Sequence, residues 1–123
     1  MNLKLTPFLL AAIFANQPAH AQQSAPSAMV VAQAADRCMT TYAVRLTKTS
    51  STDDEIYKQA SEGCASINQR VRQVFTEQFP AAQAAQALRQ MDAQARPNFF
   101  SMLTRIRSDR ARRAGEMPAS PTP

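Results

Sequence analysis

Apolar residues recur every three or four positions along two segments of the chain, which is the spacing of one face of an α-helix. In the segment 28–48 this face consists of Val31, Ala35, Cys38, Tyr42 and Leu46. In the segment 53–78 it consists of Ile56, Ala60, Cys64, Ile67, Val71 and Val74. Thr52 and Glu55 have the spacing of a capping box, so the second helix is expected to begin directly after Thr52.

The two cysteines fall on these two faces at matching positions. If the chain reverses near Ser51, residues equally distant from that point face each other, which places Cys38 opposite Cys64 and Leu46 opposite Ile56. We therefore expect an antiparallel αα-hairpin held by a Cys38–Cys64 disulfide. Such a bond, closing a loop of about 26 residues, stabilises a fold by on the order of 3 kcal/mol through the unfolded state.

The second half of the chain continues the helical pattern with two interruptions at proline. Phe79-Pro80 ends the second helix, because the residue before a proline avoids the helical conformation. The next apolar face consists of Ala84, Leu88, Met91 and Ala95. A further face after Pro97 consists of Phe99, Met102, Leu103 and Ile106, so the segments 80–95 and 97–113 form either two helices or one kinked helix.

These patterns predict an all-α fold, a small antiparallel bundle of three or four helices that occupies residues 28–114. Glycine is nearly absent from the interior, and no long alternation typical of a strand occurs. We expect residues 22–27 to form a flexible lead. Residues 115–123, which contain three prolines, are expected to form a disordered tail.

The first 21 residues have the pattern of a secretory signal peptide. Lys4 precedes an apolar run of about eleven residues, which is long enough for a signal sequence and too short to span a bilayer. Ala19-His20-Ala21 matches the small-x-small cleavage pattern, so the mature chain is expected to begin at Gln22, after Ala21. The sequence thus predicts a periplasmic or secreted protein with no transmembrane span after signal removal.

Candidate chemistry is sparse once the signal is set aside. His20 is the one histidine, and it would be lost with the signal, which removes the usual general base near neutral pH. In an oxidising compartment the two cysteines are expected to be bonded, leaving no thiolate nucleophile and no set of zinc ligands. No glycine-rich nucleotide motif occurs. We therefore expect a protein that is not an enzyme and that carries no cofactor or metal.

Positive charge is concentrated near the C-terminus, in a chain whose formal charge is +5. The candidate contact residues for an anionic partner are Arg105, Arg107, Arg110, Arg112 and Arg113. Their partner would be an acidic envelope protein or anionic lipid, and export argues against nucleic acid. Basic residues at a helix C-terminus also complement the helix dipole, which is the structural alternative. Because Arg110 and Arg113 follow Ile106, the last apolar residue of its face, Arg110, Arg112 and Arg113 are expected to contribute little to folding.

Three functional hypotheses remain. The first is an exported small helical binding or interaction module of a bacterial envelope. The second is an envelope-associating protein that binds anionic lipid through its arginine-rich C-terminal helix. The third is a histidine-free enzyme. Nothing in the sequence specifies the ligand.

Overall fold

The computed structural model describes residues 26–116, which fold entirely into helices and their connections. The helices are α1 (Ala28–Leu46), α2 (Asp53–Gly63), α3 (Ala65–Gln78) and α4 (Ala81–Glu116). The prediction of an all-α fold is confirmed for this part of the chain. The predicted signal peptide, its cleavage site at Ala21 and Gln22, and residues 117–123 of the predicted tail lie outside the described residues, while α4 extends past the expected boundary at residue 114.

Side-chain caps define where the first two helices begin. The Ser27 hydroxyl accepts a hydrogen bond from the backbone N–H of Val30 at the start of α1. At the start of α2, the Glu55 N–H donates to Thr52 Oγ1 over 3.3 Å, and the Thr52 N–H donates to Glu55 Oε2 over 2.7 Å. This reciprocal pair confirms the predicted capping box, which satisfies two N–H groups that have no partner inside the helix.

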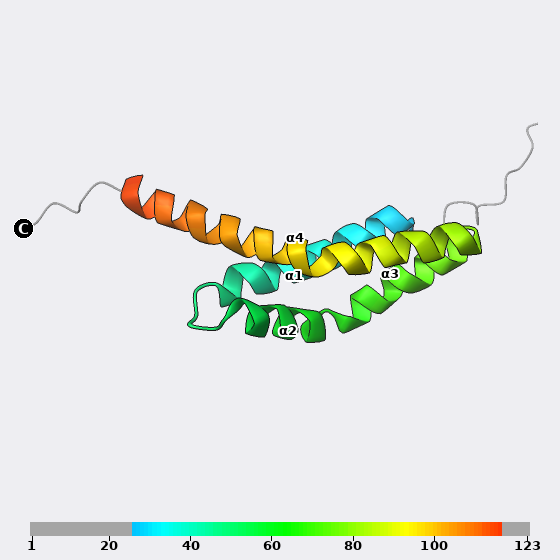
Figure 1. The fold of residues 1–123 in the computed structure, drawn as a ribbon, viewed down its shortest axis with the longest axis horizontal. Coiled ribbons are helices and arrows are strands. Elements are labelled where there is room, and N and C mark those ends of the chain that lie inside the picture. Colours follow the sequence, from blue (N-terminus) through cyan, green and yellow to red (C-terminus); the bar gives the residue numbers. More distant parts are fainter. Residues whose placement is uncertain (1–25, 117–123) are drawn as a thin grey trace, which may run out of the picture.

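The prediction of one continuous helix over residues 53–78 is wrong, because the chain breaks at Cys64. Cys64 has φ −104° and ψ 11°, outside the helical region, and it separates α2 from α3. Figure 1 shows α3 leaving the junction in a different direction from α2. Gly63, a poor helix former, directly precedes the break, and Cys64 is bonded to α1.

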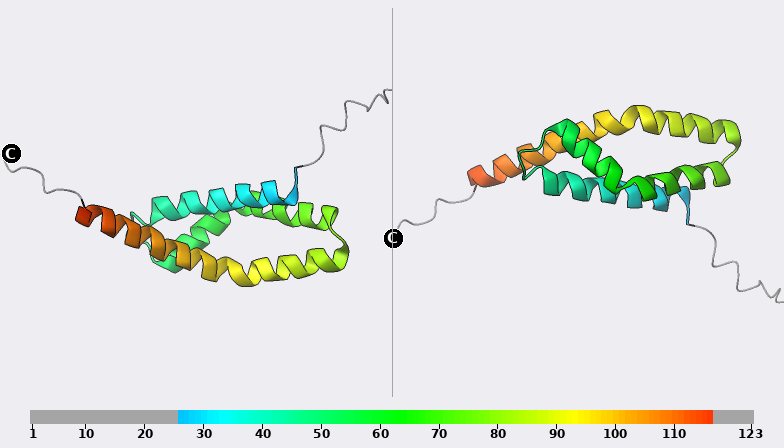
Figure 2. Two further views of the ribbon diagram at one scale, coloured as in Figure 1. Left: turned by 90° about the horizontal axis from the view of Figure 1, so that it is seen from above. Right: turned by 90° about the horizontal axis from the view of Figure 1, so that it is seen from below.

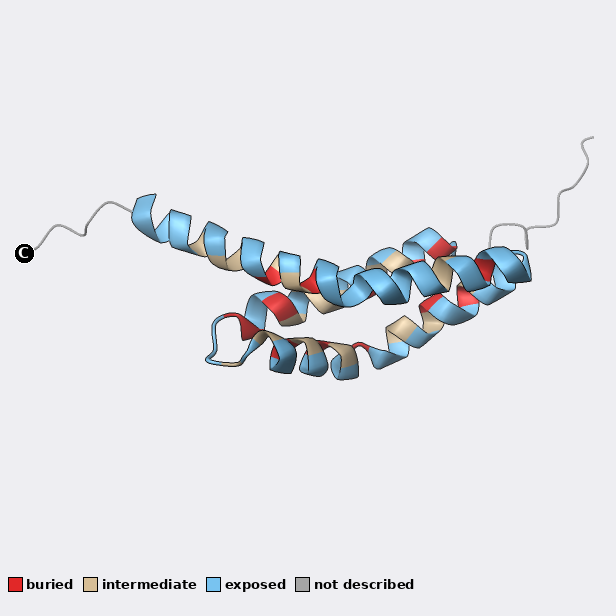
Figure 3. Ribbon diagram, viewed as in Figure 1, coloured by how far each residue is buried: buried red, intermediate tan, exposed pale blue. Residues whose placement is uncertain are grey.

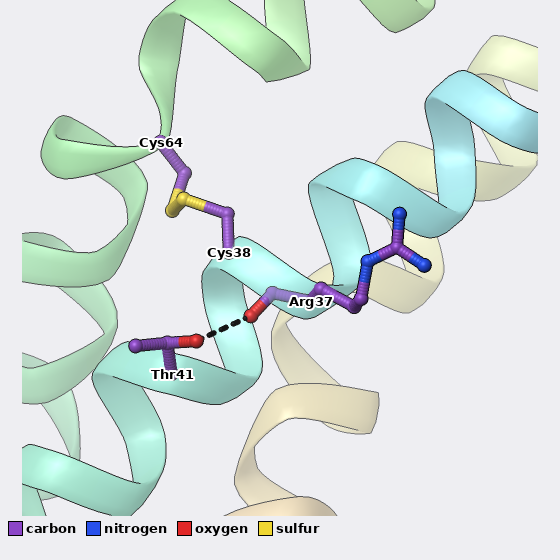
Figure 4. The surroundings of a disulfide bond; sticks show 4 residues. All are labelled: Arg37, Cys38, Thr41 and Cys64. Carbon is purple, nitrogen blue, oxygen red and sulfur yellow. Dashed lines mark hydrogen bonds between the residues drawn. A yellow bond between two sulfur atoms is a disulfide. The ribbon is translucent and has the colours of Figure 1, made fainter.

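The disulfide joins the middle of α1 to this junction. Cys38 and Cys64 are bonded with their Cα atoms 6.0 Å apart, which confirms the predicted pairing. Figure 4 shows the bond running from α1 to the point where α2 ends and α3 begins, with the Thr41 hydroxyl donating to the Arg37 carbonyl one turn along α1. Cys64 is 1% exposed, so the end of the bond at the junction of α2 and α3 lies in the interior.

The chain makes three passes along the long axis of the molecule. α1 runs one way, α2 and α3 together return, and α4 runs in the same direction as α1 (Figures 1 and 2). Two hydrogen bonds set the register of the parallel helices α1 and α4. Thr40 Oγ1 donates to Met102 Sδ over 3.4 Å, and Arg110 Nη1 donates to the Thr47 carbonyl over 3.0 Å. Gln78 at the end of α3 accepts a hydrogen bond from the N–H of Ala28 at the start of α1.

Two clusters of buried residues form the core, one on each side of the disulfide. The first cluster joins α1, α2 and α4 and consists of Ala43, Leu46, Ile56, Ala60, Phe99 and Leu103. The second joins α1 and α3 and consists of Ala28, Val31, Ala35, Val71 and Val74. Residues expected to face each other, such as Leu46 and Ile56, fall in the same cluster.

The buried face of α1 differs from the predicted one in its second half. Ala43 is fully buried, whereas Tyr42 is only half-buried. The reason is that this half of α1 packs against α4 as well as α2, which turns the buried face toward α4. Tyr42 instead lies over Gly63, next to the break.

The segments 80–95 and 97–113 form one helix, α4, with Pro97 inside it. Proline has no N–H to donate to the preceding turn, so α4 lacks one hydrogen bond there but continues as a curved rod (Figure 2). The face predicted to be buried is largely not: Ala84 is buried, but Met91 is 38% exposed and Ala95 is also exposed.

We predict that Gly63→Ala destabilises the protein by about 1–3 kcal/mol, because the new methyl group would overlap the Tyr42 ring and hydroxyl and displace them. Gly115→Ala is the matched control, since nothing lies within 4 Å of a methyl group there. It should change stability by less than about 0.5 kcal/mol. Urea unfolding followed by circular dichroism measures both, and a stabilised Gly63→Ala variant would contradict the close packing of Tyr42.

Candidate functional site

An open cleft of about 1040 Å³ lies between α4 and the neighbouring helices α1 and α3. It forms because α4 is buried at Ala84 near its start and again at Phe99 and Leu103, with no buried residue between Ala84 and Phe99. Figure 2 shows α4 curving away from α1 and α3 over this stretch, and Figure 3 shows the same stretch as largely exposed. The cleft is therefore a consequence of how α4 is held at two separated points.

Small or flexible apolar side chains supply much of the cleft wall, and polar side chains such as Asn68, Gln94 and Asn98 lie among them. The α4 wall includes Leu88, Met91, Ala95, Phe99 and Met102. The α1 wall includes Ala32, Ala35 and Met39. Val71 of α3 and Tyr57 of α2 also line it, and the Tyr57 ring packs edge-on against Phe99 with centroids 5.4 Å apart. Alanine allows close approach and methionine adapts its shape, so these walls suit a packed ligand.

Charged groups occur at the cleft but are not gathered at one point. Arg72 of α3 and Asp92 of α4 form an ion pair that connects the two helices. Both side chains are more than half exposed, so the pair contributes at most about 1 kcal/mol to stability. Asp36 of α1 and Arg105 of α4 also line the cleft.

The structure separates the five arginines that the sequence suggested as one contact. Arg107 pairs with Asp53 of α2 over 2.5 Å, and Arg112 pairs with Asp109 of its own helix over 3.3 Å. Arg105 lines the cleft, Arg110 contacts the end of α1, and Arg113 is exposed in the last turn of α4. Only Arg105 of this set is part of the cleft.

The expectation that Arg110 lies beyond the folded core is wrong. Its guanidinium donates to the Thr47 carbonyl over 3.0 Å, to Thr47 Oγ1 over 3.1 Å and to the Val44 carbonyl over 3.4 Å. These carbonyls are at the C-terminus of α1, where the last turn leaves them without partners inside the helix. Arg110 thus fastens α4 to the end of α1.

Metal-binding geometry is absent from the part of the chain that the structure describes: no group of three or more histidine, cysteine, aspartate or glutamate residues there is placed to hold an ion. Within residues 26–116 no helix has the length and hydropathy needed to cross a membrane.

Sequence reasoning missed the cleft residues as a site, although one signal pointed to them. Leu88, Met91 and Ala95 continue an apolar face through the middle of a helix. Such a face is ordinarily buried, so the sequence alone could not show that none of the helices in residues 26–116 covers it.

We predict that Arg110→Gln lowers the free energy of unfolding by about 1–2 kcal/mol, because the charged hydrogen bonds to the end of α1 are lost. The double variant Arg112→Gln, Arg113→Gln should change it by less than about 0.5 kcal/mol, since both side chains are exposed. Thermal and urea unfolding of the two proteins provide the comparison. Equal losses would show that Arg110 has no special role.

No family model matches the chain, and neither a curated protein nor a solved structure was found to be similar to it. The function must therefore be inferred from the geometry of the cleft and the charges around it.

Proposed function

We propose that this protein is an exported helical binding module of a bacterial envelope and that the cleft between α4 and the α1 and α3 helices is its binding site. Its scaffold is a disulfide-stapled αα-hairpin against which α4 completes a small antiparallel bundle. The observation that carries the proposal is the apolar face of α4 at Leu88, Met91 and Ala95, which lines an open cleft instead of a core.

Exposed apolar surface is costly, which makes this face informative. Met91 is 38% exposed, although the chain buries comparable residues such as Leu103 completely. Contiguous apolar patches on a soluble protein commonly mark binding sites, and ligand pockets typically enclose roughly 300–1,000 Å³. The cleft, at about 1040 Å³, is slightly larger than the upper limit of that range.

Two observations support export. The Cys38–Cys64 bond suits an oxidising compartment such as the periplasm or the extracellular medium. The signal-peptide pattern in residues 1–21 suggests the same destination.

The polar groups of the cleft favour binding over catalysis. Asp36 and Asp92 are the carboxylates among the described lining residues, and Asp92 is occupied by its ion pair with Arg72. A single remaining carboxylate orients a ligand more readily than it transforms one.

A second candidate function is binding of anionic lipid by the end of α4. This end projects past the connection between α1 and α2 (Figure 1), and Arg113 is exposed on it. The double variant Arg112→Gln, Arg113→Gln should then bind less to vesicles that contain anionic lipid, with a difference that shrinks as salt is raised. Binding that the two substitutions leave unchanged would exclude this surface.

Site-specific photo-crosslinking in the native host tests the leading proposal. A photoreactive phenylalanine analogue at Ala95, which lines the cleft, should give a discrete adduct. The same analogue at Ala93, an exposed residue of α4 that does not line the cleft, is the matched control and should not. The proposal fails if neither position gives an adduct or if both give the same products.

A further inference from the structure

The α4 wall of the cleft has the spacing of a coiled-coil seam. Among the α4 residues that line the cleft, six follow one another at alternating steps of three and four: Leu88, Met91, Ala95, Asn98, Met102 and Arg105. Other lining residues, such as Asp92, Gln94 and Phe99, lie beside this row. On the facing helix, Ala32, Asp36 and Met39 have the same alternation, with Ala35 and Thr40 beside them. Two helices that present such seams to a common space form holes that fit the side chains of a third helix. An alkyl chain would need no such repeat.

The length and composition of the cleft agree with a helical occupant. From Leu88 to Arg105 the α4 wall extends for about 26 Å, the length of roughly five helical turns. Ala32, Ala35 and Ala95 permit a close approach of helix backbones. The methionines among the lining residues can repack around the side chains of a partner.

Two charged residues at different positions along the cleft would orient a bound helix. Because Thr40 is bonded to Met102, Asp36 lies level with Asn98, and Arg105 lies about two helical turns further along α4. Among the described residues, neither Asp36 nor Arg105 takes part in an ion pair, in contrast to Arg72 and Asp92. A helix in the cleft can therefore place a basic residue at Asp36 and an acidic residue at Arg105, about seven residues apart.

The parallel orientation of α1 and α4 sets the preferred direction of that helix. Their dipoles are aligned, so a neighbour running antiparallel to both is favoured electrostatically. Its N-terminal part would then lie near Arg105. The acidic residue should accordingly precede the basic residue in the partner sequence.

We propose that the cleft binds an amphipathic α-helix of another protein, antiparallel to α1 and α4, with an acidic residue at Arg105 and a basic residue seven positions later at Asp36. This inference rests on the proposed binding function of the cleft and names the class of its partner.

The probe is a fluorescently labelled helical peptide of about three heptads with leucine and alanine at its apolar positions, one glutamate, and one lysine seven residues after it. Binding to the oxidised full-length protein is followed by fluorescence anisotropy. A control peptide has the glutamate and lysine exchanged. The first peptide should bind about fivefold more tightly than the control at low salt, and the difference should shrink as salt is raised.

Protein variants test the site. Ala95→Glu should reduce binding of the first peptide at least about tenfold, because it places a charge among apolar contacts, whereas Ala93→Glu on the adjacent exposed surface should not. The double variant Asp36→Lys, Arg105→Glu should reverse the preference between the two peptides. Circular dichroism of each variant establishes that it remains folded.

Three results would overturn the inference. The first is that neither peptide binds. The second is that Ala95→Glu and Ala93→Glu reduce binding of the first peptide equally. The third is self-association of the protein that Ala95→Glu abolishes, because a second copy of the chain would then be the occupant. Crosslinking at Ala95 to a lipid, combined with failure of both peptides, would also overturn it while leaving the proposed binding function intact.

Discussion

The rest of the structure depends on the Cys38–Cys64 disulfide, because it joins α1 to the one point where the returning pass of the chain is interrupted. On one side of the bond, α1 packs with α2 and α4 around Ile56 and Leu103. On the other side, α1 packs with α3 around Val71 and Val74. A domain of this size has only a modest core, and a covalent link between two separate clusters supplies stability that neither cluster provides alone.

The cleft follows from the same arrangement. With α1, α2 and α3 already fastened together, α4 is attached through Phe99 and Leu103, through Ala84 and through polar contacts such as that of Arg110. Two of the ion pairs between α4 and the other helices, Arg72–Asp92 and Arg96–Asp54, are exposed, so each contributes at most about 1 kcal/mol to stability. The Arg107–Asp53 pair is half-buried. The middle of α4 is left free of core contacts, which keeps its apolar face available to a ligand.

The sequence predicted the features that depend on local pattern or on symmetry about the turn. The capping box at Thr52 is a local hydrogen-bonding motif, and the Cys38–Cys64 pair follows from equal spacing on either side of Ser51. The break at Cys64 was missed, because the apolar face continues through it without a proline and a single glycine such as Gly63 is tolerated within a helix. The role of Arg110 and the exposure of Met91 were also missed, since both depend on where α4 docks against α1.

Hydrogen exchange measured by mass spectrometry, on the oxidised protein and on the Cys38→Ser, Cys64→Ser double variant, tests the role of the disulfide most directly. If the bond holds α1 at the junction, the variant should lose protection first in residues 60–68 and in the middle of α1 around Cys38, before the two ends of α1 change. Equal protection of these segments in the two proteins would contradict the account, because α1 and the junction would then be held together without the bond.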